Sequence, residues 1–386
     1  MALFVEFHLI QNFAPSNLNR DDTGAPKDAL FGGHRRARVS SQCFKRQIRL
    51  WVKKNGGVSP SVLGTRTRHL EHLLAEELAE LGLSEPSKLN EIVSMALKKK
   101  NPKGEKAEEG DKEDEALLSY LFFISPAEIM ALGEMVRNHA DTIKNLAQKR
   151  KLKPTDVPDQ LKDAIKASLS KLRAVDIALF GRMLADLPSA NQDAACQVAH
   201  AISTHRVERE FDYFTAVDDE GAAHETGAGM IGQVEFNSAT FYRYAVVDAA
   251  KLVGNLQQDS ALALTGLEAF TKAMARAIPS GKQNTFAAHN LPAFVGVVLR
   301  RTSPINLANA FEKPVWPKQD FPLSALSVAA LAEHDNKVSA FYGDGQDAWA
   351  YLDLSGMWPD GKGKGQPNLD ALATWVKEQV ASQLGV

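Results

Sequence analysis

The sequence predicts an α+β or α/β sandwich with a helical block inserted early in the chain. Strand-like segments occur at the start and again after residue 173, whereas residues 61–170 are dominated by helix signals. The chain has 386 residues, of which 44% are hydrophobic, and this is enough for one large core or two modest cores.

The first segment, Phe4 to Ile10, alternates between apolar and polar residues. The odd positions from Val5 to Leu9 would share one face, with Glu6 and His8 on the other, which predicts a half-buried strand. A loop dense in turn formers and hydrogen-bonding side chains follows over residues 14–27.

The next segment predicts a basic amphipathic helix. Phe44 and Ile48 lie on one apolar stripe, and Ser40 or Ser41 can cap the N-terminus. Residues 29–70 contain ten Lys or Arg and no Asp or Glu, although the formal net charge of the whole chain is only −2. A polyanion is the natural partner of such a surface, and the start of a helix attracts phosphate. A merely solvated helix face is the alternative, and the absence of acids argues against it.

The inserted block contains three predicted helices. One carries leucines from Leu70 to Leu81, a second opens at Ser125 with a capping box, and a third follows Pro158. Residues 98–115 are nearly all charged or polar and predict an exposed loop.

Strand signals return after Arg173. The segments with this pattern are 175–181, 211–217, 236–247 and 293–300. A helix is predicted over 264–278, and Asn368 opens a terminal helix. A Gly-rich stretch between two of these strands predicts a long hairpin over 206–236.

The hairpin tip contains Gly227-Ala228-Gly229-Met230-Ile231-Gly232, which matches the dinucleotide fingerprint. That motif needs a buried strand before it and a helix after it, whereas here a polar loop precedes and a strand follows, so we reject a nucleotide cofactor. Met230 and Ile231 would be exposed near the tip, which is costly unless they contact a partner. Alternatively, they pack on their own hairpin.

The composition argues against several classes of protein. Cys43 and Cys196 are too few for a disulfide framework or a thiolate zinc site, and no His-x-x-x-His or His-Glu-x-x-His pattern occurs. We therefore expect no metal and no cofactor. No apolar run is long enough to span a bilayer and no signal peptide opens the chain, which predicts a cytoplasmic protein with no membrane partner.

His200 and His205 suggest an alternative function. Two histidines could serve as the acid and base of a metal-independent endoribonuclease, with His34 as a further candidate. Histidines whose ring nitrogens are satisfied locally are the simpler interpretation.

Blocks distributed over nearly the whole chain, in the same order, resemble the CasC backbone subunits of type I-E CRISPR Cascade complexes. They are Ser16–Asp22, Lys27–Arg36, Arg38–Gln42, Val175–Met183, Ala199–His205, Phe214–Asp219, Phe241–Tyr244 and Ala308–Lys313.

The resemblance implies a hand-like, non-catalytic subunit. Its palm is RRM-like (ferredoxin-like) and comprises residues 1–60 and 171–386, its helical fingers are residues 61–170, and its thumb is the hairpin 206–236 within the palm. Several copies would stack along the crRNA as a helical filament and present it to target DNA in antiviral defence, together with other Cascade subunits. No enzymatic activity is expected.

The resemblance also implies site residues. Those at the guide backbone are Asn19, Arg20, Lys27, Ser40, Gln42, Lys45 and Arg49, to which the basic cluster adds His34, Arg35, Arg36 and Arg46. Met183 would join Met230 or Ile231 as a clamp at a displaced base. A row in the helical block, Arg137, Lys144, Lys149, Arg150, Lys151 and Lys153, could face target DNA, or it is a solvated helix face.

Overall fold

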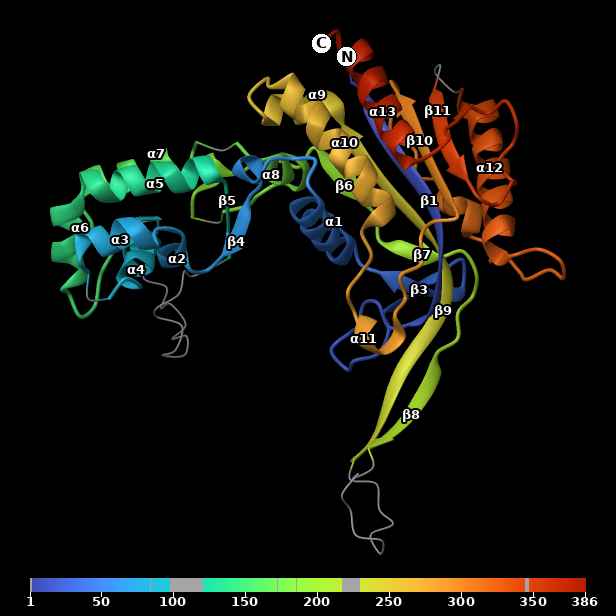
Figure 1. Cartoon of the computed structure of the whole chain (residues 1–386), viewed down its shortest axis with the longest axis horizontal. Coiled ribbons are helices and arrows are strands. Elements are labelled where there is room, and N and C mark those ends of the chain that lie inside the picture. Colours follow the sequence, from blue (N-terminus) through green and yellow to red (C-terminus); the bar gives the residue numbers. More distant parts are fainter. Residues whose placement is uncertain are drawn as a thin grey trace, which may run out of the picture. The chain divides into compact units, whose positions relative to one another are not determined.

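The computed structural model describes residues 2–83, 85–97, 121–171, 173–184, 186–216, 230–343 and 347–386. Two compact units are present (Figure 1). The first comprises Met1–Gly57, Cys196–Lys251 and Leu264–Val386, and the second comprises Val58–Ala195 and Leu252–Ala263. Strands dominate the first unit and helices the second, which confirms the predicted mixture of α and β elements.

The first unit is built on a large sheet with the strand order β12-β11-β10-β1-β9-β7-β3-β2. Its strands are β1 (Phe4–Ser16), β2 (Asp28–Phe31), β3 (His34–Val39), β6 (Cys196–Val198), β7 (Ala201–Ser203), β8 (Glu210–Ala216), β9 (Met230–Asp248), β10 (Phe294–Arg300), β11 (Ala348–Asp353) and β12 (Lys364–Gly365). β6 and β8 pair with β9 off the main path. β1 is central, because it pairs antiparallel with both β9 and β10.

Helices cover both faces of this sheet (Figure 1). On one face, Phe44 of α1 (Ser41–Asn55) packs with Phe13 and Phe241, and Phe270 of α10 (Ser260–Arg276) lies edge-on to Phe7 at 5.2 Å between ring centroids. α12 (Leu323–Tyr342) covers the other face, where Val328 and Leu331 pack with Ile10, Tyr242 and Phe294. The remaining helices of this unit are α11 (Gln283–Phe286) and α13 (Leu369–Leu384), together with a 3₁₀ turn at Leu307–Phe311.

The prediction that Phe4–Ile10 is half-buried is wrong, because α12 covers the face that carries Glu6 and His8. Both of these side chains are fully buried. Arg300 Nε donates to Glu6 Oε1 at 3.1 Å, and His8 Nδ1 lies 2.9 Å from the hydroxyl of Tyr242. The buried polar groups on β1 are thus satisfied by side chains of the neighbouring strands β9 and β10.

The second unit packs helices around one apolar core. They are α2 (Leu70–Leu73), α3 (Ala75–Leu81), α4 (Lys88–Leu97), α5 (Pro126–Asn138), α6 (Ala140–Ala147) and α7 (Asp159–Ser168). α8 (Val175–Phe180) contributes Ile177 to a separate small cluster with Phe123 and Ala174. A two-stranded sheet joins β4 (Thr65–Thr67) to β5 (Phe122–Ile124). α9 (Ala249–Asn255) runs from the first unit into the second.

Two sequence predictions in the second unit need correction. The leucine stripe from Leu70 to Leu81 forms two helices rather than one, since the backbone breaks at Leu74. Residues 175–181 form α8, not a strand, and every residue from Val175 to Phe180 is buried. Because the segment is buried on all sides, its short apolar run carried no helical period to distinguish it from a strand.

The predicted N-terminal caps of three helices are confirmed. Ser125 forms the predicted capping box with Glu128, Ser40 caps α1, and Asn368 caps α13. The hairpin strands are present, with β8 and β9 in register from Glu210↔Phe236 to Ala216↔Met230. The Gly-rich segment 217–229 and the polar segment 98–115 lie outside the described residues. Among the helices that the structure describes, none is both long enough and apolar enough to cross a membrane.

Candidate nucleic-acid interface

The loop after β1 is held in one conformation by its own polar side chains. Asn17 Nδ2 donates to the carbonyl oxygens of Gly24 and Glu235, each at 2.9 Å. Asp21 Oδ1 accepts from the amides of Thr23 and Ala25 at 3.0 Å. The hydrogen bond from the Thr23 hydroxyl to the same carboxylate contributes most to lowering the pKa of Asp21. These hydrogen bonds therefore fix the backbone of the loop.

This loop also positions the start of α1. Asn19 Oδ1 accepts from the amide of Ser40 at 2.8 Å, and Ser40 Oγ in turn accepts from the amide of Cys43 at 3.3 Å. Ser40 is buried, so its hydroxyl serves as a helix cap. The side chains of Asn19 and Ser40 thus fix the start of α1, and they satisfy the amides of Ser40 and Cys43 within the protein.

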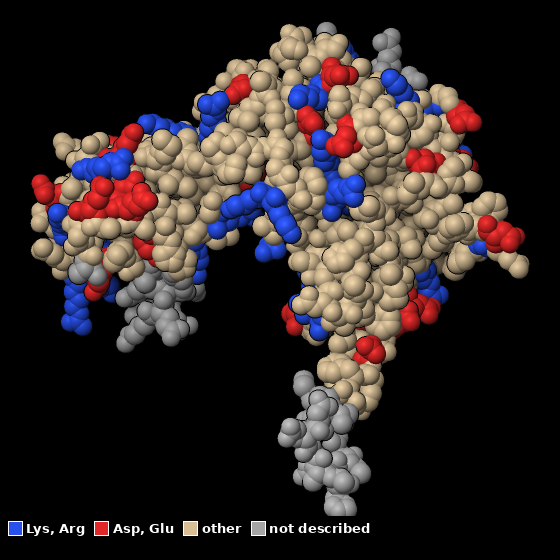
Figure 2. All heavy atoms as spheres, in the orientation of Figure 1, with Lys and Arg blue, Asp and Glu red and all other residues tan. Residues whose placement is uncertain are grey.

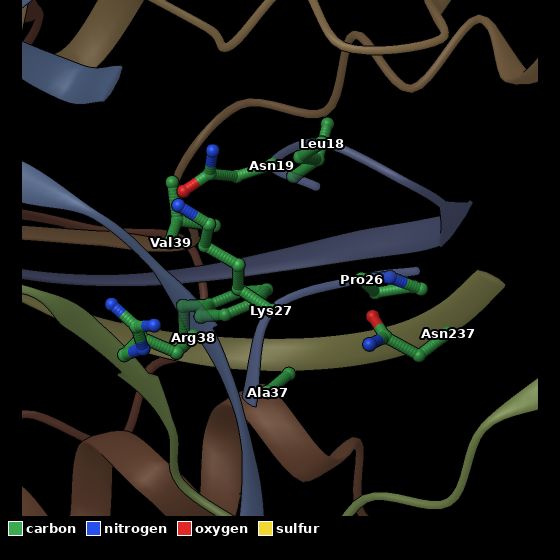
Figure 3. Close-up of a pocket in the computed structure, with 9 residues that line it drawn as sticks. Leu18, Asn19, Pro26, Lys27, Ala37, Arg38, Val39 and Asn237 are labelled. Carbon is green, nitrogen blue, oxygen red and sulfur yellow. The ribbon is translucent and has the colours of Figure 1, made fainter. Parts of the chain in front are cut away.

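A small pocket lies where the loop, β3 and β9 meet. It is lined by Leu18, Asn19, Pro26, Lys27, Ala37, Arg38, Val39, Asn237 and Phe241. Figure 3 shows Asn19, Lys27 and Arg38 on one side of it and Pro26 and Asn237 on the other. The amide of Lys27 donates to the Asn19 carbonyl, and the amide of Arg38 donates to the Lys27 carbonyl, both at 2.9 Å. Two cations from adjacent segments, Lys27 and Arg38, therefore line a small pocket whose other walls are mostly apolar.

α1 carries the basic face away from its buried stripe of Phe44, Ile48 and Val52. Gln42 and Arg46 are exposed, whereas Lys45 and Arg49 are half-buried. The helix has no acidic residue, and its cations are Lys45, Arg46, Arg49, Lys53 and Lys54. Figure 2 shows Lys and Arg side chains gathered where α1 lies in Figure 1. The first unit thus has a predominantly basic surface that continues from the pocket along α1.

Arg38 was not among the predicted site residues, and His200 was considered only as a catalytic candidate. Arg38 Nη1 lies 3.0 Å from His200 Nδ1, and Arg38 Nε donates to the Asp28 carbonyl at 3.1 Å. Burial and the adjacent Arg38 lower the pKa of His200. This favours a neutral ring that accepts a hydrogen bond from Arg38. The two residues are 162 positions apart, so only the charge of Arg38 could have drawn attention to this pair.

The prediction that Arg36 contacts RNA is wrong. Arg36 is fully buried, and its guanidinium donates to the carbonyl oxygens of Ser203 at 3.0 Å, Phe311 at 2.8 Å and Glu312 at 3.1 Å. Burial lowers its pKa. Arg36 therefore ties β3 to β7 and to the turn after β10, and it takes no part in the surface.

The other predicted residues near β3 remain at the surface, in varied settings. Arg35 forms an ion pair with Asp28, and Arg209 donates to the same carboxylate at 2.8 Å and to Glu235 Oε2 at 3.1 Å. These pairs join β2 to the base of the β8–β9 hairpin. His34 is half-buried, with its ring edge-on to Trp316. Arg20 is exposed on the loop.

The predicted base clamp falls in two units. Met183 is 82% exposed and belongs to the second unit. Met230 and Ile231 begin β9 in the first unit, opposite Ala216 and Thr215, and their side chains lie outside the described residues. Their meeting with Met183 stays a prediction.

The cations predicted to face target DNA lie on the second unit. Arg137 pairs with Glu77 at 3.1 Å and Lys149 pairs with Asp156 at 2.9 Å. Lys144, Arg150 and Lys151 are exposed, as is Lys153. This row is thus partly neutralised by neighbouring carboxylates.

His205 has both ring nitrogens engaged. Nδ1 lies 2.7 Å from the Arg206 carbonyl, and Nε2 accepts from the amide of Thr240 at 3.1 Å. This arrangement requires a neutral ring with the proton on Nδ1, and burial lowers the pKa of His205 accordingly. The ring is a structural element in this state.

Comparison with known proteins extends over almost the whole chain. Residues 5–375 match the family described as CT1975-like protein. A solved chain from a "CRISPR RNA-guided surveillance complex, pre-nicking" is 32% identical, with a TM-score of 0.83, over 98% of this chain and 100% of that chain. A chain from another "CRISPR RNA-guided surveillance complex" is 28% identical, with a TM-score of 0.73, over 97% and 99%. No curated protein sequence matches the chain.

Proposed function

The chain belongs to the CT1975-like protein family, and on that premise we propose that it is a non-catalytic, guide-RNA-binding backbone subunit of a CRISPR surveillance complex. Within such complexes we assign it to the CasC subunits of type I-E Cascade, on the sequence blocks described above. Several copies stack along the crRNA in the cytoplasm, beside other Cascade subunits, and hold the guide for pairing with target DNA.

The observation that carries this proposal is the basic surface formed by the pocket and α1. Lys27 and Arg38 line the pocket, and the cations of α1 continue from it. Cations suit phosphate oxygens, and contacts to phosphate and sugar position a nucleic acid without reading its sequence. A subunit that must accept every guide needs such contacts, because base pairing with the target reads the sequence.

The sheet supports an RRM-like palm. β1, α1, β7, β9, α10 and β10 follow one another along the chain, and the spatial order β10-β1-β9-β7 is the arrangement of a ferredoxin-like fold. RRM domains stack bases on aromatic residues of the exposed sheet face. Here α12 covers that face, and Tyr242 and Tyr244 on β9 are buried. We therefore place the guide along the basic surface rather than on the sheet.

The hairpin and the helical unit take the other roles. We assign the β8–β9 hairpin as the thumb and the helices between α2 and α7 as the fingers. Arg209 supports the thumb by joining Asp28 to Glu235 at the base of the hairpin. Met183, Met230 and Ile231 would displace one guide base, and the energy of unstacking, a few kcal/mol, would be offset by apolar contact with the base.

A direct test compares RNA retention with RNA cleavage. The purified chain is incubated with precursor RNA in excess chelator, and product formation is followed alongside filter binding. We expect binding without cleavage, because His205 has no free ring nitrogen. Specific cleavage that His34→Ala, His200→Ala or His205→Ala abolishes would identify a metal-independent endoribonuclease instead.

A further inference from the structure

Three potential metal ligands gather at the start of α2 in the second unit. They are His69, Glu71 and His72, whose candidate ligand atoms all lie within 4.8 Å of one another. His69 Nδ1 is 3.0 Å and His72 Nε2 is 3.8 Å from the same carboxylate oxygen, Glu71 Oε1. The two imidazole rings are parallel within 4°, with centroids 4.8 Å apart.

These separations are close to those of a tetrahedral zinc site. Metal–ligand bonds of about 2.0–2.1 Å place neighbouring ligand atoms roughly 3.4 Å apart. Both measured nitrogen–oxygen distances differ from this separation by about 0.4 Å. Because each imidazole lone pair lies in its ring plane and the two planes are parallel, at least one ring must also turn before both nitrogens face one ion. Two imidazoles and one carboxylate form a donor set that zinc accepts, and that leaves a fourth position for water.

The surroundings hold the ligands in place. Asn90 Nδ2, on α4, donates to Glu71 Oε2 at 2.5 Å, and Asn90 Oδ1 accepts from the amide of Leu70 at 3.1 Å. The Thr67 hydroxyl accepts from the amide of His69 at 2.8 Å. Asn90 is fully buried, so it orients the Glu71 carboxylate as outer-shell partners do in metal sites.

Access to the cluster is open on one side. The side chain of Glu71 is only 10% exposed, whereas those of His69 and His72 are 44% and 73% exposed. The buried carboxylate forms the floor and the two imidazoles form the rim. An ion can therefore enter from solvent and retain a water ligand.

We infer that His69, Glu71 and His72 bind one divalent transition-metal ion of the zinc type, with water in the fourth position. The ion joins the residue before α2 to α2 itself and, through Glu71 and Asn90, to α4. It thereby stabilises the start of the helical unit. No metal was expected from the sequence because the chain contains neither His-x-x-x-His nor His-Glu-x-x-His. His69-x-Glu71-His72 is a shorter pattern.

The experiment uses the full chain without a polyhistidine tag, stripped with a chelator and dialysed. Zn²⁺ is titrated in competition with a chromophoric chelator at pH 7.5 and pH 5.5. We expect one ion per chain at pH 7.5, weaker binding at pH 5.5 where protons compete for the imidazoles, and a rise in the melting temperature with Zn²⁺.

Matched variants test the assignment. His72→Ala and Glu71→Gln should each weaken Zn²⁺ binding by about 10-fold or more, while His289→Ala, at an exposed histidine elsewhere, should leave it unchanged. Glu71→Gln keeps an acceptor for Asn90, and circular dichroism of each apo variant checks that it folds. Absence of a stoichiometric site, or equal affinity in all three variants, would overturn the inference. Guide-RNA binding does not enter this measurement.

Discussion

The basic surface of the first unit and the basic row of the second unit differ in what surrounds their cations. In the first unit, α1 contains no acidic residue, although Arg35 on the preceding β3 pairs with Asp28. In the second unit, several cations form ion pairs with carboxylates: Arg137 with Glu77, Lys149 with Asp156, Lys162 with Asp159, and Lys166 with Asp163. A phosphate that approaches the second unit must compete with these carboxylates. The environment of a cation therefore indicates its role better than the number of cations does.

Buried cations form a third class, and they resemble neither surface. Arg182 donates to both oxygens of Glu128 at 2.8 and 2.9 Å and to the carbonyls of Phe123, Leu169 and Ala190. Arg36 donates only to carbonyls. Both hold backbone segments together, and neither is available to a ligand.

The largest expected loss of stability follows from breaking the buried ion pair of Glu128 and Arg182. Glu128→Ala should destabilise the second unit by about 3–5 kcal/mol, because it leaves the buried Arg182 without a counter-charge and removes the capping box of α5. Urea unfolding measures the change, and the exposed Glu134→Ala on the same helix is the control. Equal stability of both variants would mean that the pair is not needed.

Substitution of the adjacent arginines Arg35 and Arg36 on β3 should change the free energy of unfolding by different amounts. Arg36→Ala leaves three carbonyls without their donor and should cost roughly 2–4 kcal/mol of unfolding free energy. Arg35→Ala removes a pair whose arginine is half-exposed, which is worth about 1 kcal/mol or less. Thermal and urea unfolding of the two variants measure this contrast. A reversed order would contradict the burial of Arg36.

A pH-dependent effect of intermediate size is expected at His205. Its pKa in the folded chain lies below the usual 6.5, chiefly through burial, so the fold binds fewer protons than the unfolded chain. Its contribution to stability is fully present above pH 6.5 and is lost as the pH falls through the folded pKa. His205→Gln should therefore reduce the loss of stability between pH 7 and pH 5. Unfolding curves with the same pH slope as the parent would refute this prediction.

The smallest effects on stability should come from the paired surface cations. Arg137→Ala with Lys149→Ala should change stability by about 1 kcal/mol or less, since both pairs are solvent-exposed. If these residues also meet target DNA, its association with the assembled complex should slow while guide RNA is retained. Stopped-flow measurements on parent and variant complexes separate the two outcomes, and equal association rates would exclude a role in DNA capture.

Short-range patterns predicted much of the fold. Helix caps at Ser40, Ser125 and Asn368 were correct because a cap depends on a few neighbouring residues. The prediction for α8 was wrong because an entirely buried helix shows no amphipathic period. Glu6 and His8 were placed on a solvent face because the partners that satisfy them come from β9 and β10, far along the chain.

In the candidate site, too, features set by neighbouring residues were predicted, whereas features set by distant residues were not. The basic cluster was visible as composition, yet the sequence could not distinguish Arg36, which is buried under Phe311 and Glu312, from Arg38, which lines the pocket. That difference depends on a turn 270 or more residues away. The three residues of the proposed metal cluster are close in sequence, but the support from Asn90 requires the packing of α4 on α2.

The most direct test of the central claim is the salt dependence of RNA binding by the parent and by a Lys45→Ala, Arg46→Ala, Arg49→Ala variant. Each phosphate neutralised on a single strand contributes about −0.7 to the slope of log affinity against log salt, so the triple variant should bind more weakly with a slope shallower by about 2. Two unrelated guide sequences should lose affinity equally, because contacts with the phosphates do not read bases. An unchanged slope, or a loss confined to one sequence, would contradict the assignment of α1 as the guide-backbone surface.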